Sequence, residues 1–340
     1  MKHSLFRYFQ LFIIAIFIYA CNGNKTNSVD DANPVFQNDP ILKAITLEIK
    51  NDPTNAHLYF ERATKLYKLK QDSLAYRDYK KAAAIDTNNA EYLSAVGDFL
   101  FEKKDITGSI EWIKKAMAKN PTDRKSHLKI AKMMLYIKKY NESLKEIDIV
   151  LRNNPFDGEA YFLKGMVYKD MKDTAKAISS FQTSVDVQPD YKDAIVQLGL
   201  LYNAKKDPKG FLYLDNAAKL DTTDVFPIYA KGVYFQEGND FEHAKEEYKK
   251  CIMHDSHYVN ALFNLGFIYM QQDSVEKAMR QYDIVTKIDP VNAPAFFNRG
   301  ICKESLDSIP QAIADYKQAL RLNPDYPNPK EALKRLKVIK

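Results

Sequence analysis

The side chains with the greatest capacity for chemistry in this 340-residue sequence are its cysteines and histidines, and they are few. The chain has three cysteines and six histidines. Cys251, His254 and His257 lie within seven residues, a spacing that could suggest a metal site. However, the two histidines span a predicted helix end and turn, where no ligand geometry is enforced, and no further ligand cluster lies near them. We therefore predict no metal site and interpret Cys251 and Cys302 as buried thiols.

No residue pattern indicates catalysis or binding of a soluble cofactor. Most glycines recur at regular intervals inside predicted helices and do not form a loop that could hold a phosphate. No Ser, His and Asp set lies on a strand–turn–helix unit, because no strands are predicted. We predict a protein that is not an enzyme and has no catalytic residues. The net charge of +6 is too small to favour a nucleic-acid partner.

The N-terminus has the features of an export signal. Lys2 and Arg7 precede an apolar run of ten residues, 11–20. A membrane-spanning helix needs about 20 apolar residues, so a shorter run behind positive charges indicates a secretory signal peptide. The sequence at the end of the run, IYAC, resembles the signal of bacterial lipoproteins. That resemblance implies that residues 1–20 are removed and that Cys21 carries covalent lipid, palmitate included; the alternative is a plain signal peptide.

The residues after Cys21 are predicted to form a tether. Residues 22–38 are polar and lack helical periodicity, so we expect a flexible segment at 21–38 that lifts the folded part off the membrane. Loss of Lys2 and Arg7 with the signal lowers the net charge from +6 to +4. The remaining residues, 39–340, are predicted to form one elongated domain.

A 34-residue repeat dominates this domain. Eight repeats, the fifth of 33 residues, cover 271 residues (56–326) and begin at Ala56, Ala90, Arg124, Gly158, Lys192, Val225, Val259 and Ala293. Position 8 is always small: Ala63, Gly97, Ala131, Gly165, Gly199, Gly232, Gly266 and Gly300. Position 20 is small as well, and position 24 is large and apolar, from Tyr79 in the first repeat to Tyr316 in the last. Such a period predicts an array of stacked units.

The repeat positions have a steric explanation. Two helices that cross closely need small residues where positions 8 and 20 meet, and a large residue at position 24 fills the space beside them. Proline near the end of five repeats stops the second helix. The pattern resembles the tetratricopeptide repeat family, although the usual leucine at position 7 varies. The resemblance implies an all-α solenoid, a right-handed superhelix of antiparallel helix pairs.

The ends and the fifth repeat depart from the pattern. Asp39 and Pro40 predict a capping helix over 41–49, and residues 330–340 predict a C-terminal capping helix. The fifth repeat lacks one residue near Lys205–Gly210, where we expect a local irregularity.

The first helix of each repeat is predicted to present a binding surface. In the family, the flank formed by positions 2, 5, 9 and 12 lines a concave groove for peptides. In repeats six to eight, eight of its twelve residues are apolar: Phe226, Tyr229, Val233, Phe263, Phe267, Met270, Phe297 and Ile301. In repeats one to three the flank is mixed, with Glu91, Asp98, Lys125 and Lys132 beside apolar residues such as Phe60 and Leu128. The family's carboxylate clamp is not assembled, since Asn264 and Asn298 lack the matching lysines.

These features predict a lipid-anchored scaffold. We expect a protein or peptide segment to bind the apolar groove, and the membrane to be contacted through the lipid on Cys21. Asn22 after the acceptor cysteine favours an outer-membrane location that faces the periplasm, within a cell-envelope complex. The alternatives are a carbohydrate-binding or enzyme-associated subunit of an outer-membrane system, and a self-assembling oligomer.

Overall fold

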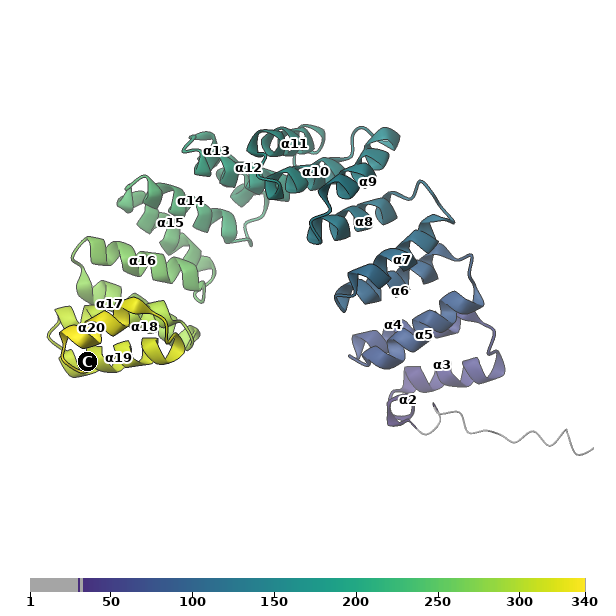
Figure 1. Cartoon of the computed structure of the whole chain (residues 1–340), viewed down its shortest axis with the longest axis horizontal. Coiled ribbons are helices and arrows are strands. Elements are labelled where there is room, and N and C mark those ends of the chain that lie inside the picture. The colour runs from purple at the N-terminus through teal and green to yellow at the C-terminus, as the bar shows by residue number, and fades with distance from the viewer. Residues whose placement is uncertain (1–29, 31–32, 340) are drawn as a thin grey trace, which may run out of the picture. The chain divides into compact units, whose positions relative to one another are not determined.

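A computed structural model describes residue 30 and residues 33–339, and its regular structure is helical throughout (Figure 1). These residues form nineteen helices and no strand. The chain divides into two compact units, Met1–Met133 and Met134–Lys340. The predicted signal peptide, 1–20, and the predicted lipidation site, Cys21, lie outside the described residues.

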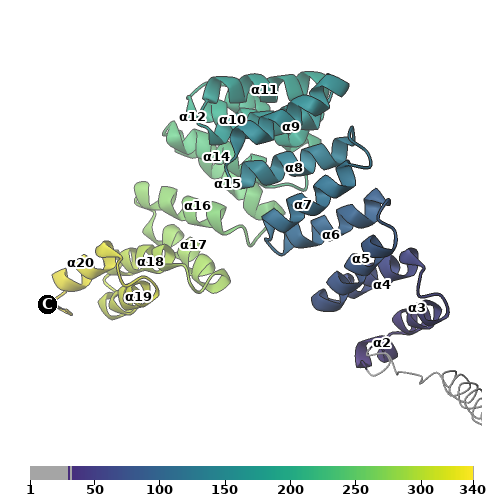
Figure 2. The ribbon, with the colours of Figure 1, turned by 45° about the vertical axis from the view of Figure 1, so that its right-hand side comes forward.

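The first unit is a run of helices in which neighbours along the chain pack together. Its helices are α2 (Pro34–Asn38), α3 (Pro40–Asn51), α4 (Ala56–Lys68), α5 (Asp72–Ile85), α6 (Ala90–Glu102), α7 (Ile106–Met117) and most of α8 (Arg124–Tyr136). From α2 to α7 each helix contacts the next, and the pairs α4–α5 and α6–α7 lie side by side (Figure 2). Its core includes Ala63, Leu66 and Val96, which are fully buried.

The second unit continues with the same pairing. It contains α9 (Tyr140–Asn153), α10 (Gly158–Asp170), α11 (Thr174–Val187), α12 (Lys192–Ala204), α13 (Lys209–Leu220), α14 (Phe226–Glu237), α15 (Phe241–His254), α16 (Val259–Gln271), α17 (Val275–Ile288), α18 (Ala293–Ser305), α19 (Ile309–Leu322) and α20 (Pro327–Arg335). The helices of each repeat pack together, and each second helix contacts the first helix of the next repeat. Each repeat from α10 to α19 is therefore a helical hairpin that packs against its neighbours.

The predicted repeat boundaries are confirmed. Seven first helices begin at the predicted residue, and α14 begins at Phe226, one residue after the predicted start of its repeat. Several starts follow from capping side chains: Asn55, Asn89, Asp157 and Asn292 each accept a hydrogen bond from a backbone N–H in the first turn of their helix.

The turn between the two helices of every repeat uses a residue with left-handed backbone geometry, and none of these residues is glycine. Position 15 has φ between 52° and 64° in all eight repeats: Lys70, Lys104, Lys138, Lys172, Lys206, Asn239, Asp273 and Asp307. The following N–H donates to the carbonyl five residues earlier, as in Gln71 N to Leu66 O at 2.9 Å. This bond closes the first helix in the manner of a Schellman motif.

The close approach predicted for position 8 is confirmed. A Cβ added at Gly165 would lie 2.5 Å from the ring of Phe181, and one added at Gly300 would lie 2.6 Å from the ring of Tyr316. The nearest neighbour of this added Cβ is thus the large residue at position 24. At Gly300 the next neighbour is the backbone carbonyl oxygen of Ala312 at position 20, which lies 3.3 Å from the added Cβ. Glycine at position 8 therefore lets the ring at position 24 approach the first helix closely.

The irregularity expected in the fifth repeat is present, but the missing residue affects the second helix and leaves the turn intact. Lys206 keeps its left-handed conformation. Helix α13 has 12 residues, compared with 14 in α11 and α15, and begins one residue before Gly210 at position 20. A Cβ at Gly210 would lie 1.9 Å from Oδ1 of Asn203, so glycine here accommodates the buried amide of the preceding helix.

Both predicted end segments need correction. The prediction of a flexible tether is wrong for residues 34–38, because these residues form α2 and the side chain of Phe36 is fully buried. The N-terminal capping helix exists and is capped by Asp39, whose carboxylate accepts from two backbone N–H groups. At the C-terminus, α20 begins at Pro327 and ends at Arg335, whereas the predicted helix covered 330–340. The helix stops short of residue 340 because Lys337 takes a left-handed conformation. In the described part, no helix has the length and apolar content that crossing a bilayer requires.

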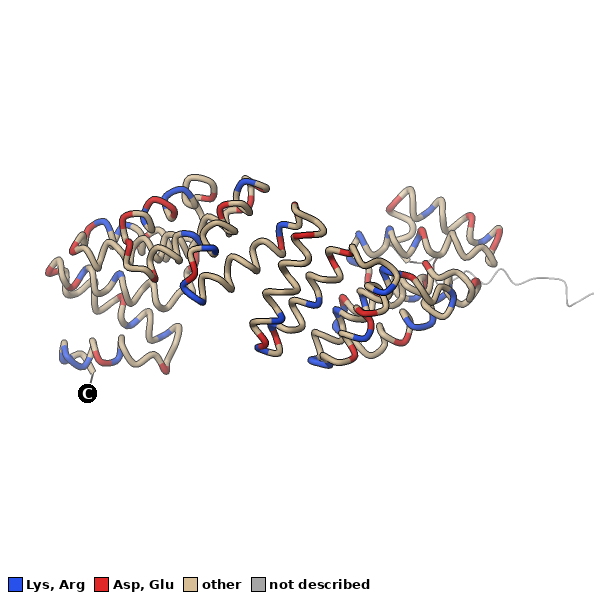
Figure 3. The backbone as a smooth tube through the Cα atoms, turned by 90° about the horizontal axis from the view of Figure 1, so that it is seen from above, with Lys and Arg blue, Asp and Glu red and all other residues tan. Residues whose placement is uncertain are grey.

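Charged residues of both signs are interspersed along the helices of each unit (Figure 3). In four repeats the residue at position 7 is basic and is buried or half-buried: Arg62, Lys164, Lys231 and Arg299. Each donates to a carboxylate of another helix. The departure from leucine at position 7 is therefore an alternative, ionic way to join helices.

Candidate partner-binding groove

The aromatic residues at position 5 of the predicted groove are partly used for packing. The Tyr229 ring lies 5.8 Å from Tyr248 of its own repeat and 5.3 Å from Tyr258, which precedes the next repeat. Phe297 repeats this arrangement with Tyr316 at 5.7 Å and Tyr326 at 5.4 Å. Aromatic pairs at these centroid distances stabilise the fold beyond simple burial. These side chains are half-buried, with one face packed on the array and the remainder accessible.

The same arrangement recurs in other repeats. Phe263 lies 5.4 Å from Tyr282, and Phe60 lies 5.8 Å from Tyr79 and 5.0 Å from Tyr92. Position 5 is thus a structural anchor in both units. Because these rings pack within and between repeats, an aromatic residue at position 5 does not by itself indicate ligand binding.

Other members of the predicted groove reach solvent. Phe226 is 38% exposed and Phe267 is 37% exposed, whereas Val233, Met270 and Ile301 are half-buried. We refer to the eight residues predicted for repeats six to eight as the apolar flank. All of them keep some exposed surface.

A cavity lies at the end of the apolar flank. Its volume is about 570 Å³, and it is lined by Phe297, Ile301 and Tyr316 together with four residues of α20: Asn328, Glu331, Ala332 and Arg335. The wall is apolar on the side of α18 and polar on the side of α20. This cavity is large enough for an amino-acid side chain or a short peptide segment.

The polar wall is held by an ion pair and a hydrogen bond on Glu304. Arg335 contacts the Glu304 carboxylate at 2.8 Å, and the Tyr316 hydroxyl donates to it at 2.6 Å. Burial and the neighbouring Glu304 carboxylate raise the pKa of Tyr316 above its usual value. The phenol is therefore a neutral donor at physiological pH, and Glu304 has its charge compensated.

The first unit has its own hollows on the corresponding flank. A cavity of about 450 Å³ and a smaller one of about 130 Å³ share Phe60, Ala95 and Asp98. Lys129 and Asp98 both line the larger cavity, and the Lys129 ammonium donates a hydrogen bond to Asp98 at 2.6 Å. Leu128, which the flank pattern placed in the groove, is only 3% exposed and belongs to the core. The hollows of the first unit therefore combine an aromatic floor with paired charges.

The polar residues considered for other sites are engaged in packing. The Asn264 amide donates to the Tyr229 hydroxyl at 3.2 Å and to the Tyr248 hydroxyl at 3.1 Å. Cys251 and Cys302 are free and buried, and burial raises the pKa of their thiols to about 12 and about 11. At neutral pH both remain protonated and poorly nucleophilic. Among the described residues, no group of three His, Cys, Asp or Glu side chains could hold a metal ion.

Sequence reasoning missed the basic residues at position 7. Their signal was present in the sequence: where position 7 is basic, an acidic residue occurs at position 25 of the preceding repeat or at position 23 of the same repeat. Lys231 follows Asp215 in this way and is joined to it at 2.8 Å. A search for charge pairs at these spacings would have found them.

Models of the tetratricopeptide repeat match three windows of this chain. One matches residues 158–191 and 259–292, and another matches residues 293–326. These windows are the fourth, seventh and eighth repeats, with the same boundaries as those seen in the sequence and in the helices. The chain contains tetratricopeptide repeats. Its stacked repeats form a scaffold for protein interaction.

Similar proteins share the repeats but differ in overall length. Protein O-mannosyl-transferase TMTC3 of Homo sapiens is 24% identical over 226 residues, which cover 65% of this chain and 25% of that protein. BBSome complex member BBS4 of Bos taurus is 27% identical over 180 residues, which cover 53% of this chain and 34% of that protein. The chain thus spans about a third or less of these relatives.

A solved structure shows the same fold. The C-terminal part of a TPR repeat-containing protein from Cytophaga hutchinsonii superposes with a TM-score of 0.57 at 18% identity. The alignment covers 72% of this chain and 99% of the solved chain. At this identity the likeness concerns the architecture of stacked helical hairpins.

Proposed function

We propose that this tetratricopeptide repeat protein is a non-catalytic, lipid-anchored scaffold that binds a segment of a partner protein along the apolar flank. The observation that carries the proposal is the cavity lined by Phe297 and Ile301, at the end of a series of first helices that each expose apolar side chains. A partner segment with apolar side chains fits this surface, because each flank residue already has one face held by the array.

The packing of the flank supports tight binding. Rings fixed by their neighbours lose little conformational freedom when a partner covers them, so less of the binding free energy is spent on ordering. Aromatic and methionine side chains are also the types that dominate protein interfaces. Phe226 and Phe267 expose the largest fractions of this flank and are the expected anchors.

The proposed setting of the scaffold rests on sequence features of the N-terminus. The short apolar run before Cys21 supports export and lipidation, and Asn22 supports an outer-membrane location facing the periplasm. The partner would then be a component of a cell-envelope complex. Lipidation is tested by metabolic labelling with palmitate: Cys21→Ser should abolish labelling and release the protein from membranes, and persistence of both would refute the anchor.

The groove is tested by photocrosslinking in the native membrane. Benzoyl-phenylalanine is placed at Phe267 or Ile301 on the apolar flank, and at Met253 as a control, because Met253 is 84% exposed on the second helix α15. We expect both flank positions to form adducts with the same segment of one protein, and Met253 to form none with it.

Direct binding of that segment completes the test. A synthetic peptide of the captured sequence should bind the mature chain, and Phe267→Asp should weaken its affinity at least tenfold. Met253→Asp should leave the affinity within twofold. An equal loss with both variants, or no loss with Phe267→Asp, would contradict binding at the apolar flank.

A further inference from the structure

The basic residue at position 7 has a recurring partner in the preceding repeat. In the second unit, Lys164, Lys231 and Arg299 each donate to an aspartate at position 25 of the repeat before. The partners are Asp148 at 3.1 Å, Asp215 at 2.8 Å and Asp283 at 2.8 Å. This contact joins the first helix of one repeat to the second helix of the previous one.

The first repeat has the same basic residue but no full repeat before it. Helix α3 takes the place of a preceding second helix, and Thr46 stands where position 25 would be. The Thr46 hydroxyl accepts a hydrogen bond from Nη1 of Arg62 at 3.1 Å, but it supplies no charge. Arg62 is only 1% exposed, so its charge must be compensated. Its own repeat supplies one carboxylate, Asp78, but Asp78 also accepts a hydrogen bond from Arg77. A second carboxylate is therefore needed.

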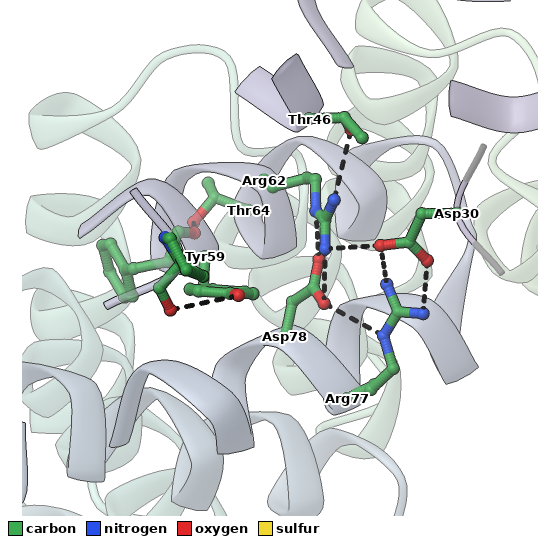
Figure 4. Close-up of polar contacts among 9 residues, drawn as sticks. Asp30, Thr46, Tyr59, Arg62, Thr64, Arg77 and Asp78 are labelled. Atoms are coloured by element: carbon green, nitrogen blue, oxygen red, sulfur yellow. Dashed lines mark hydrogen bonds and ion pairs between the residues drawn. The ribbon is translucent and has the colours of Figure 1, made fainter. Parts of the chain in front are cut away.

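Asp30 supplies the missing carboxylate, as Figure 4 shows. Its Oδ2 lies 3.0 Å from Nη2 of Arg62. It also binds Arg77 with both oxygens, at 2.6 Å and 3.1 Å. Asp78 completes the cluster, because it accepts from Nε of Arg62 at 2.6 Å and from Nε of Arg77 at 3.0 Å. Two guanidinium groups and two carboxylates thus compensate one another.

Helix α2 packs against the same two arginines as Asp30. Asn33 caps the helix by accepting from Val35 N at 3.0 Å. The ring of Phe36 is fully buried and lies under both guanidinium groups, with its centroid 4.9 Å from Cζ of Arg62 and 5.8 Å from Cζ of Arg77. Cation–π contacts of this kind stabilise desolvated arginines. Asp30 and Phe36 therefore bind the same two arginines.

We propose that Asp30 and residues 33–38 form a clasp that closes the first repeat and fixes residue 30 against it. The clasp replaces the carboxylate that a preceding repeat would donate. Together with the proposed lipid on Cys21, on which this step rests, it shortens the tether to the residues between Cys21 and Asp30. An extended chain of that length reaches about 30 Å, compared with about 60 Å for a tether that continues to residue 39. The clasp thus holds the first repeat beside the lipid surface.

Amide hydrogen exchange of the mature full-length chain tests the clasp without any membrane. Asp30→Ala should speed exchange in residues 33–38 at least tenfold. Glu111→Ala, which removes an exposed carboxylate from α7 of the same unit, should change it less than twofold. Exchange in α10 and α11 should be unchanged and reports that the variants remain folded. Equally fast exchange of residues 33–38 in the wild-type chain and Asp30→Ala would overturn the clasp.

Energy transfer from the lipidated chain to vesicles tests the consequence for the membrane. A donor dye at Lys68→Cys, an exposed site at the end of α4, is paired with an acceptor on lipid headgroups. We expect Asp30→Ala to lower the transfer efficiency, because residues 30–38 are added to the tether. Measurable transfer of equal efficiency in both proteins would refute the shortened tether. Absence of transfer in both, with the exchange result intact, would instead refute the lipid anchor.

Discussion

Arg62 in the first repeat and Arg299 in the last occupy the same repeat position and make the same contact within their own repeat. Each guanidinium binds both oxygens of an aspartate at position 23, which is Asp78 for Arg62 and Asp315 for Arg299. Outside the repeat they differ. Arg299 takes Asp283 and Thr286 from the preceding helix α17, each at 2.8 Å, whereas Arg62 takes Asp30 from a segment that precedes the repeats altogether.

The difference shows how a repeat array can end. A repeat that follows another obtains its compensating charge from that preceding neighbour, whereas the first repeat must obtain it from elsewhere or lose the buried cation. The two arginines also differ in burial: Arg62 is 1% exposed, whereas the side chain of Arg299 is 15% exposed. The N-terminal segment therefore covers its arginine more completely than a helix of the array does.

Arg62→Ala is expected to have the largest effect on stability. It leaves Asp78, which is also 1% exposed, without its bidentate partner and removes the contact with Phe36. Removing one member of a buried ion pair destabilises by about 3–5 kcal/mol. Urea unfolding of the first unit, followed by amide exchange in α4 and α5, measures the loss. A loss no larger than that of the exposed variant Lys114→Ala, which should stay within about 0.5 kcal/mol, would contradict a buried cluster.

Arg299→Ala should destabilise less, by about 2–3 kcal/mol, because its site is more exposed and its carboxylates have other partners. Lys303 donates to Asp315 at 2.7 Å, and Lys287 lies 2.6 Å from Asp283. Exchange in α17 and α18 measures this effect. An effect at Arg299 equal to or larger than that at Arg62 would show that the N-terminal segment contributes no additional burial.

The periodic part of this structure could be predicted from the sequence, because each repeat uses the same steric solution. Small residues such as Gly165 and large ones such as Phe181 recur at fixed spacing, so the helix pairs and their boundaries follow from the alignment of the chain with itself. The N-terminal clasp could not be predicted in this way. It occurs once, and the sequence around Phe36 is too short and too polar to show helical periodicity.

The repeat spacing predicts which flank of each first helix carries the candidate groove, but it does not predict how exposed each residue is. Spacing places Tyr229 and Phe297 on the predicted groove flank of their helices, yet both also pack on residues of the following turn, Tyr258 and Tyr326. The exposed fraction of each ring therefore depends on contacts with residues distant in the sequence, which the repeat spacing alone does not reveal. The cavity at Phe297 likewise depends on where α20 begins, and that boundary was predicted three residues too late.

Lys231→Leu tests whether an ionic and an apolar position 7 are interchangeable. The sixth repeat has Lys231 with Glu247 at position 23, whereas the seventh has Leu265 with Gln281. Lys231→Leu alone should destabilise by about 1–3 kcal/mol, since Glu247 is 6% exposed and loses one cation while it keeps Lys250. The double variant Lys231→Leu/Glu247→Gln should recover most of this loss, as measured by exchange in α14 and α15. Additive losses would show that the two kinds of repeat are not equivalent.

The smallest expected effect is at a half-buried junction between repeats, where Lys192 contacts Asp221 at 2.7 Å and Asp224 at 2.9 Å. The Lys192 ammonium, and then Thr223, hold the pKa of Asp221 well below its usual range. A lowered pKa means that the ionised aspartate contributes stability above its unfolded pKa of about 3.9, and that this contribution is lost as the pH falls towards the folded value. Asp221→Asn should therefore be slightly less stable than the wild type above about pH 5 and approach it below about pH 4. Thermal unfolding of both proteins across this range measures the difference. Since Asp224 remains to bind Lys192, a gap that widens as the pH falls would contradict the assignment.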